Sequence, residues 1–88
     1  MKVDFMTRRG CHLCSEARSE LDSHLARLGE AGASIEVREV DIETDDELHR
    51  RYLERIPVIE IEGETVSEFA FDPVAFDTAL AGRERQPG

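Results

Sequence analysis

The sequence lacks the long apolar runs that mark membrane segments and secretion signals. No apolar stretch approaches the ~18 residues that identify a membrane span, and residues 1–5 hold no apolar core of a signal peptide. Cysteine is also scarce, because two cysteines in 88 residues cannot form the disulfide framework of a small secreted protein. From these absences we expect a cytoplasmic protein with no membrane partner, in a compartment that keeps thiols reduced.

Positive charge is in short supply as well. The chain has 11 Lys and Arg residues against 20 Asp and Glu residues, a formal net charge of −9. Because nucleic-acid binding depends on neutralising phosphates, we expect no nucleic-acid partner. The acidity fits either an ordinary solvated surface or a preference for basic proteins. The length allows one modest core, and we expect a monomer with one domain over residues 1–82 and a flexible tail over residues 83–88.

The two cysteines are spaced Cys11-x-x-Cys14, between an expected strand and an expected helix. Unpaired N–H groups and the helix dipole at a helix start favour the thiolate, which is the reactive form of cysteine. Cys14 lies one turn inside the helix, within reach of a disulfide with Cys11. We therefore expect Cys11 to attack and Cys14 to resolve. Arg8, Arg9 and His12 also favour the thiolate, although His12 fits equally well as a solvated loop residue.

Hydrophobic periodicity outlines the start of the chain. Residues 2–6 alternate apolar and polar side chains, which predicts a strand. Residues 12–29 carry one apolar stripe, which predicts a helix that Gly29 and Gly32 end. The stripe consists of Leu13, Ala17, Leu21, Leu25 and Leu28. His24 lies beside it and is expected to be a boundary residue rather than a ligand.

A second strand and a second helix follow. Residues 35–40 predict a strand that either ends near Glu39 or is buried on both faces, because its apolar residues change phase. Thr44 and Glu47 match a capping box, with Thr44 as the N-cap of a helix that runs to about residue 53.

The remaining residues predict a hairpin and a last helix. Pro57 fits the start of a strand that reaches residue 61, and the turn around Gly63 returns a strand over residues 65–67. Asp72 and Pro73 open a helix that Gly82 stops. The order is β-α-β-α-β-β-α, which predicts an α/β fold with one four-stranded mixed sheet and helices on both faces.

This element order, the Cys-x-x-Cys pair after the first strand and the Ile56-Pro57 strand start resemble the thioredoxin fold. In length and number of strands the chain is similar to glutaredoxins. The site Thr7-Arg8-x-Gly10-Cys11-His12-Leu13-Cys14 and the later Arg55-Ile56-Pro57-Val58 resemble a group of small bacterial glutaredoxin-like proteins. The resemblance covers about residues 2–81.

The resemblance implies roles for individual residues. Cys11 matches the nucleophile and Cys14 the resolving thiol. Pro57 matches a cis-proline that packs against the disulfide, and Ile56 a residue whose backbone pairs with an extended substrate. Arg8 matches a basic residue near the thiolate or the carboxylate of glutathione.

One thioredoxin feature is displaced in this sequence. The buried Asp that thioredoxins carry ahead of the site would fall on Phe5. Asp4 is one residue early, and one step along a strand reverses the face. We therefore expect Asp4 to be a solvated or paired carboxylate and assign it no catalytic role.

Glutathione recognition is expected to be weak. Glutaredoxins place two glycines and an Asp after the last strand to hold the γ-glutamyl group. The matching positions here are Ser67, Glu68 and Ala70, so the open backbone and the acid are missing, and Glu68 adds a like charge.

Three functions compete at this point. The first is a thiol–disulfide oxidoreductase with no bound cofactor, acting on protein or small disulfides. Its candidate electron sources are glutathione, another low-molecular-weight thiol, or thioredoxin reductase. The second is a metal or iron–sulfur module, although no second Cys/His cluster supplies the remaining ligands and we assign no metal ligand. The third is a redox-inert interaction domain of the thioredoxin fold.

Overall fold

The computed structural model describes residues 1–84, and it reproduces the expected order of elements with two short additions. The elements are β1 (Lys2–Thr7), α1 (His12–Arg27), α2 (Glu30–Ala33), β2 (Glu36–Asp41), a 3₁₀ turn (Ile42–Thr44), α3 (Asp46–Tyr52), β3 (Val58–Ile61), β4 (Glu64–Glu68) and α4 (Pro73–Glu84). None of the helices described in residues 1–84 is long and apolar enough to cross a membrane.

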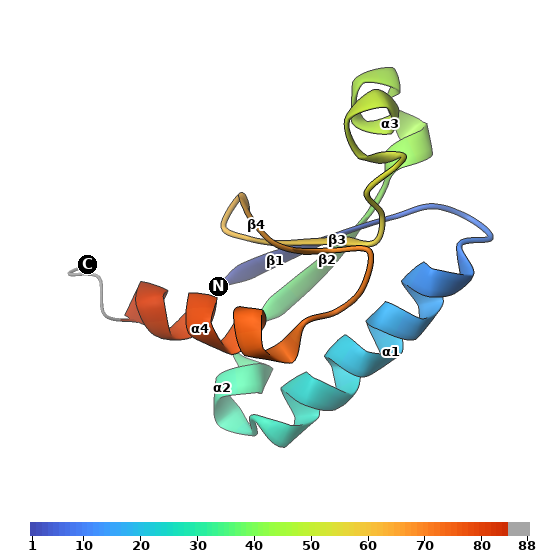
Figure 1. Ribbon diagram of the computed structural model, residues 1–88. Coiled ribbons are helices and arrows are strands. Elements are labelled where there is room, and N and C mark those ends of the chain that lie inside the picture. The colour runs from blue at the N-terminus through green and yellow to red at the C-terminus, as the bar shows by residue number, and fades with distance from the viewer. Residues whose placement is uncertain (85–88) are drawn as a thin grey trace.

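The strands form one four-stranded sheet in the order β2-β1-β3-β4. β1 is parallel to β2 and antiparallel to β3, which is in turn antiparallel to β4. The sheet is therefore mixed, as predicted. Figure 1 shows α1 and α4 on one side of the sheet and α3 on the other. The expected α/β architecture with helices on both faces is confirmed.

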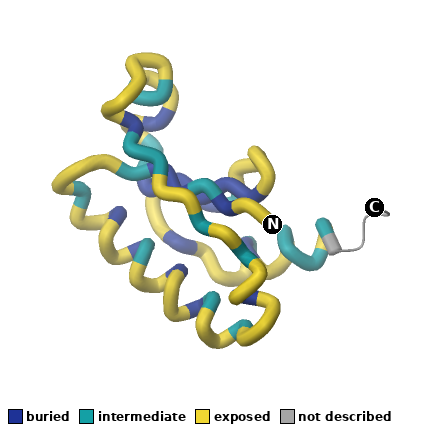
Figure 2. Tube along the Cα trace, turned by 180° about the vertical axis from the view of Figure 1, so that it is seen from behind, coloured by how far each residue is buried: buried dark blue, intermediate teal, exposed yellow. Residues whose placement is uncertain are grey.

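The main core lies between the sheet and the α1/α4 layer. β1 and β3 point alternate side chains into it, since successive residues of a strand face opposite sides. Its buried members are Val3, Phe5, Cys14, Ala17, Leu21, Ile59, Ile61, Phe71 and Phe76. Figure 2 shows the buried positions recurring along α1 and concentrated in the inner strands.

The opposite face of the sheet has a smaller core under α3. Met6, Ile42, Tyr52 and Val58 are its buried members. Beyond them the face is polar. The Tyr52 hydroxyl donates to Glu60 Oε2 at 2.9 Å, and the Thr65 hydroxyl donates to the same oxygen at 3.3 Å.

Asp4 also lies on this polar side, in the central strand β1. Its carboxylate accepts a hydrogen bond from Arg38 Nε of the neighbouring strand at 3.0 Å. The expectation of a paired carboxylate is confirmed.

The predicted end of the first helix was right for Gly29 and wrong for Gly32. α1 ends at Arg27 with Leu28 as its C-cap, and Gly29, with φ 62°, follows it and begins the separate turn of helix α2. Gly32 does not terminate a helix: a Cβ built there would clash with the carbonyl of Leu25, so glycine permits close packing of α2 on α1. Leu13 is not in the buried stripe, because its side chain is 57% exposed.

β2 and α3 also differ from expectation. β2 is an edge strand that runs to Asp41, and it is only half-buried on each face, where Val37 and Val40 contact the two cores. The N-cap of α3 is Asp45, whose side chain accepts from the N–H groups of Glu47 and Leu48. Thr44 instead closes the preceding 3₁₀ turn by donating to Asp41 O at 2.7 Å. An Asp one residue later therefore takes the capping role, which both residue types can perform.

Helix α4 begins as predicted and ends later. The Asp72 carboxylate accepts from Ala75 N–H at 3.1 Å, which confirms the N-cap. The helix passes Gly82 and includes Arg83, which donates to Ile61 O at 2.9 Å and pairs with Glu64 at 3.0 Å. The predicted tail from residue 83 therefore starts too early, and its residues 85–88 lie outside the described part.

Candidate functional site

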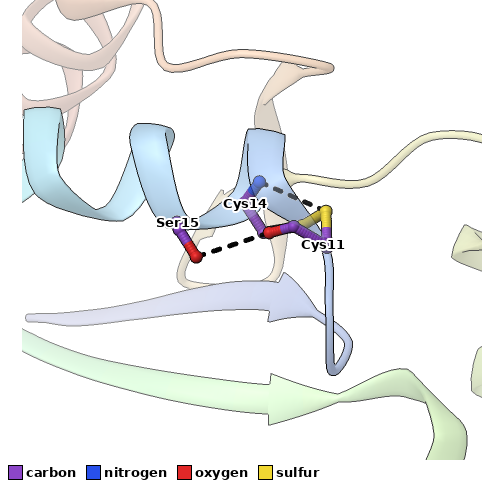
Figure 3. The surroundings of a disulfide bond; sticks show 3 residues. All are labelled: Cys11, Cys14 and Ser15. Carbon is purple, nitrogen blue, oxygen red and sulfur yellow. Dashed lines mark hydrogen bonds between the residues drawn. A yellow bond between two sulfur atoms is a disulfide. The ribbon is translucent and has the colours of Figure 1, made fainter.

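Cys11 is the N-cap of α1, and Cys14 lies one turn inside the helix. Their Cα atoms are 5.2 Å apart, and the two sulfurs form a disulfide. The amide of Cys14 donates to Cys11 Sγ at 3.2 Å, while Ser15 Oγ donates to Cys11 O at 3.4 Å (Figure 3). The sulfur of Cys11 therefore occupies the place that a capping oxygen usually takes, where a helix start stabilises negative charge.

The two cysteines differ in exposure. Cys14 is 2% exposed and belongs to the main core, whereas Cys11 is half-buried at its rim. This asymmetry follows from their positions, because the N-cap stands at the end of the helix and the third helical residue turns toward the sheet. Only Cys11 is open to a bulky partner.

A tight turn delivers the chain from β1 to Cys11. Cys11 N–H donates to Arg8 O at 3.4 Å, and Gly10 has φ 75°. A turn with positive φ at its third residue favours glycine, because other residues pay a steric cost there. Arg8 and Arg9 project from this turn as exposed residues.

The charges around Cys11 are unequally distributed. The first turn of α1 contains no acidic residue, so no carboxylate offsets the positive end of the helix dipole. Across residues 1–84, Arg8 and Arg9 form no ion pair. His12 instead lies 3.2 Å from Glu16 on the outer surface of the helix, with its side chain 87% exposed.

The loop before β3 completes the site. The Ile56–Pro57 peptide bond is cis, as predicted. Pro57 is fully buried, and Ile56 packs against the main core together with Cys11. Ile56 and the cysteine pair therefore contact the same core, and Pro57 is buried next to Ile56 in the chain. Arg8 and His12 remain on the exposed side of the pair.

Sequence reasoning missed Phe69, the residue that directly follows β4. Phe69 has φ 71° and a side chain that is 57% exposed. Its N–H donates to Pro57 O at 2.9 Å and to Arg55 O at 3.1 Å, which ties it to the cis-proline loop. The available signal was a pair of phenylalanines, Phe69 and Phe71, in the short segment between β4 and α4.

The charge expected from Glu68 is partly compensated. Glu68 accepts from the Arg55 guanidinium at 3.1 Å, and this hydrogen bond raises the pKa of Arg55 above its ordinary value. The backbone N–H of the following residue, Phe69, is already engaged by two carbonyls. Residues 67–68 stand where glutaredoxins have the glycine pair that holds the γ-glutamyl group. Here the amide of Phe69 is not free to bind that group, and the acid of Glu68 is already paired with Arg55.

A polar hollow of about 430 Å³ lies between α1 and strands β1 and β2, and Cys14 is one of its lining residues. Arg18 spans it, with ion pairs to Asp22 at 3.0 Å and to Glu39 at 3.2 Å. No sequence pattern indicated this contact, because Glu39 comes from the edge strand. Among residues 1–84, no group of three His, Cys, Asp or Glu side chains is placed to hold a metal ion.

The chain is similar to known proteins in sequence and in structure. The model of a family described as Glutaredoxin-like domain (DUF836) matches residues 2–80. No curated protein matches significantly. Among solved structures, target protein XcR50 from X. campestris is similar at 25% identity and TM-score 0.66, with 91% of this chain and 96% of that chain covered.

Two further structures are similar at lower identity. Thioredoxin 1 from Thermosipho africanus aligns at 13% identity and TM-score 0.60, covering 97% of this chain and all of the other. A structure described as a malarial protein aligns at 17% identity and TM-score 0.57, covering 97% of each chain. These likenesses establish the thioredoxin fold.

Proposed function

Since the chain belongs to the glutaredoxin-like domain family, we propose that it is a thiol–disulfide oxidoreductase. The observation that carries the proposal is the Cys11–Cys14 disulfide at the start of α1, with Cys11 half-buried at the rim of the core and Cys14 inside it. A metal module and an inert domain leave this asymmetry without a role. The proposed compartment is the cytoplasm, where cellular reductants keep such a pair reduced.

The chemistry is a two-step exchange of sulfur bonds. The Cys11 thiolate attacks one sulfur of a substrate disulfide, forms a mixed disulfide and releases a thiolate that takes up a proton. Cys14, after losing its proton, attacks Cys11 Sγ and releases the second substrate thiol. Two electrons and two protons pass to the substrate, and the Cys11–Cys14 disulfide remains. A low-molecular-weight thiol or a reductase such as thioredoxin reductase then restores the dithiol.

The surrounding residues have supporting roles in this proposal. The open helix start and the arginines Arg8 and Arg9 favour the Cys11 thiolate. Ile56 and Pro57 form the wall along which an extended substrate lies. His12, exposed next to Cys11, contacts the bound substrate.

The test is electron transfer to a model disulfide from thioredoxin reductase and from glutathione, assayed side by side. The intact protein is expected to turn over with at least one donor, and Cys11→Ser is expected to be inactive. Ser19→Ala, an exposed serine on the same helix, is the matched control. A pair that does not cycle between reduced and oxidised forms in a dithiothreitol and oxidised-glutathione titration would support the inert domain instead.

Glutathione is expected to be a poor co-substrate. The segment at Ser67, Glu68 and Ala70 lacks glycines and a free acid for the γ-glutamyl group. Each missing charge-assisted hydrogen bond is worth roughly 1.5–3 kcal/mol. Oxidised-glutathione affinity, measured on Cys14→Ser, is expected to be weak. Tight binding or efficient glutathione-coupled turnover would contradict this expectation.

A further inference from the structure

Two large apolar side chains remain exposed over the first turns of α1, the helix that carries the cysteine pair. Leu13 lies between the cysteines in sequence, Phe69 follows β4, and each is 57% exposed. Both line one small hollow with Ala70. We call Leu13, Phe69 and Ala70 the Leu13–Phe69 patch. Exposed apolar side chains that gather next to a reactive group indicate a contact surface more than isolated ones do.

Phe69 has a backbone conformation that bulky residues avoid. A bulky residue at φ 71° is a genuine outlier, and such strain persists only where the surroundings enforce it. Here the hydrogen bonds from Phe69 N–H to Pro57 O and Arg55 O enforce it. Phe71, two residues later, is 8% exposed and supplies the core. The main core therefore has its own aromatic from this segment, and the exposed ring of Phe69 is left for another contact.

The same hollow has an acidic side. Glu16 and Glu20 line it, on successive turns of α1. Glu16 is 57% exposed at its side chain and has His12 as its neighbour. An apolar spot with carboxylates on one edge is complementary to an apolar side chain with a cationic side chain close by. Glutathione, which is anionic and has no large apolar side chain, matches neither part.

We propose that the Leu13–Phe69 patch binds the polypeptide that flanks the target cysteine, and that it selects a segment with one apolar and one basic side chain near that cysteine. The inference rests on the proposed oxidoreductase function and specifies its substrate class as basic protein disulfides. The apolar side chain of the substrate packs on Phe69 and Leu13. Its Lys or Arg lies against Glu16 and Glu20.

The test uses four synthetic peptides with an intramolecular disulfide, whose cysteines are flanked by Leu and Lys, Leu and Glu, Ser and Lys, or Ser and Glu. Reduction by the intact protein is measured together with that of a small disulfide that has no flanking side chains. We expect kcat/KM for the Leu/Lys peptide to exceed that for the Ser/Glu peptide by about tenfold or more, because the Ser/Glu peptide lacks the apolar contact and brings a like charge to Glu16 and Glu20.

Two variants separate this inference from the proposed function. Phe69→Gly removes the ring and relieves the positive φ, so it is expected to fold while losing the preference for Leu and keeping the rate on the small disulfide. Glu20→Lys is expected to reverse the preference from Lys to Glu. Equal kcat/KM values for all four peptides, with normal turnover of the small disulfide, would overturn the inference alone. Failure to reduce any disulfide would overturn the proposed function.

Discussion

The two faces of the sheet are built differently. The face under α1 and α4 is closed by apolar side chains from every layer, including Leu21 and Phe76, both 0% exposed. The face under α3 has four buried apolar residues and continues into a polar network of Tyr52, Glu60 and Thr65. The cysteine pair belongs to the first face, because Cys14 is a member of its core.

The two faces therefore make different contributions: one supplies the free energy of folding, and the other fixes one conformation. Apolar burial supplies most of the free energy of folding, so the α1/α4 face holds the helix that carries Cys11 and Cys14. The buried carboxylate of Glu60 is costly unless it is paired, and a polar network tends to fix one arrangement rather than add stability. Changes on the first face should therefore affect stability strongly, and changes on the second should leave the redox chemistry intact.

The largest effect is expected from Phe76→Ala. Phe76 is fully buried and packs edge-on against Phe71 and His24, with ring centroids 5.6 and 5.9 Å apart. Its truncation is expected to lower the free energy of unfolding by about 3–5 kcal/mol. Urea denaturation measures this loss, with Val74→Ala on the exposed side of the same helix as a control. A loss under 1 kcal/mol would remove the distinction between the faces.

A smaller effect is expected from Tyr52→Phe, which breaks the hydrogen bond to Glu60. The predicted loss at neutral pH is about 1–2 kcal/mol, because Glu60 is buried and loses a donor. The rate of disulfide reduction is expected to stay unchanged. A clear fall in the rate of disulfide reduction would mean that the α3 face also affects the redox site.

The same tyrosine gives a pH dependence with a definite sign. Burial, then the hydrogen bond to Glu60, raises the pKa of Tyr52 above 10.0. A group whose pKa is raised by folding contributes stability below its unfolded pKa and loses it as pH rises through the folded value. The stability advantage of the wild type over Tyr52→Phe should therefore shrink above about pH 10. An advantage that grows with pH would contradict the assignment.

The smallest effect is expected from Arg38→Gln. Arg38 pairs with Asp4 on the polar face, but its side chain is 73% exposed. Exposed ion pairs contribute about 0–1 kcal/mol, and salt weakens them further. Thermal unfolding at low and high salt measures the change. A loss comparable with that of Phe76→Ala would show that charge, not apolar burial, holds this part of the sheet.

The sequence predicted what depends on local pattern. Alternation, helical stripes and the Asp72–Pro73 start all produced the correct elements, and the Cys11 and Cys14 positions followed from the helix start. The errors occurred where tertiary packing decides. Gly32 was predicted to end a helix, but it lies inside α2. Glycine is needed there because of a close contact with Leu25 of α1, which the sequence pattern does not reveal.

Long-range contacts account for the remaining differences. Arg83 was assigned to the tail, but it donates a hydrogen bond to Ile61 O of β3. That partner is distant in the sequence, so no local pattern indicated the contact. His24 was expected at a boundary, but it is 8% exposed and lies 2.7 Å from Asp77 of α4. Phe69 was missed because its conformation is set by the carbonyls of Arg55 and Pro57.

The most direct test of the account traps the first sulfur exchange. Cys14→Ser is incubated with a peptide disulfide, and the product is digested and mapped by mass spectrometry. A stable mixed disulfide is expected on Cys11, because the buried resolving thiol is gone, and no adduct is expected with Cys11→Ser. An adduct that forms on Cys14 in the Cys11→Ser variant at a comparable rate would contradict the assignment of attacking and resolving thiols.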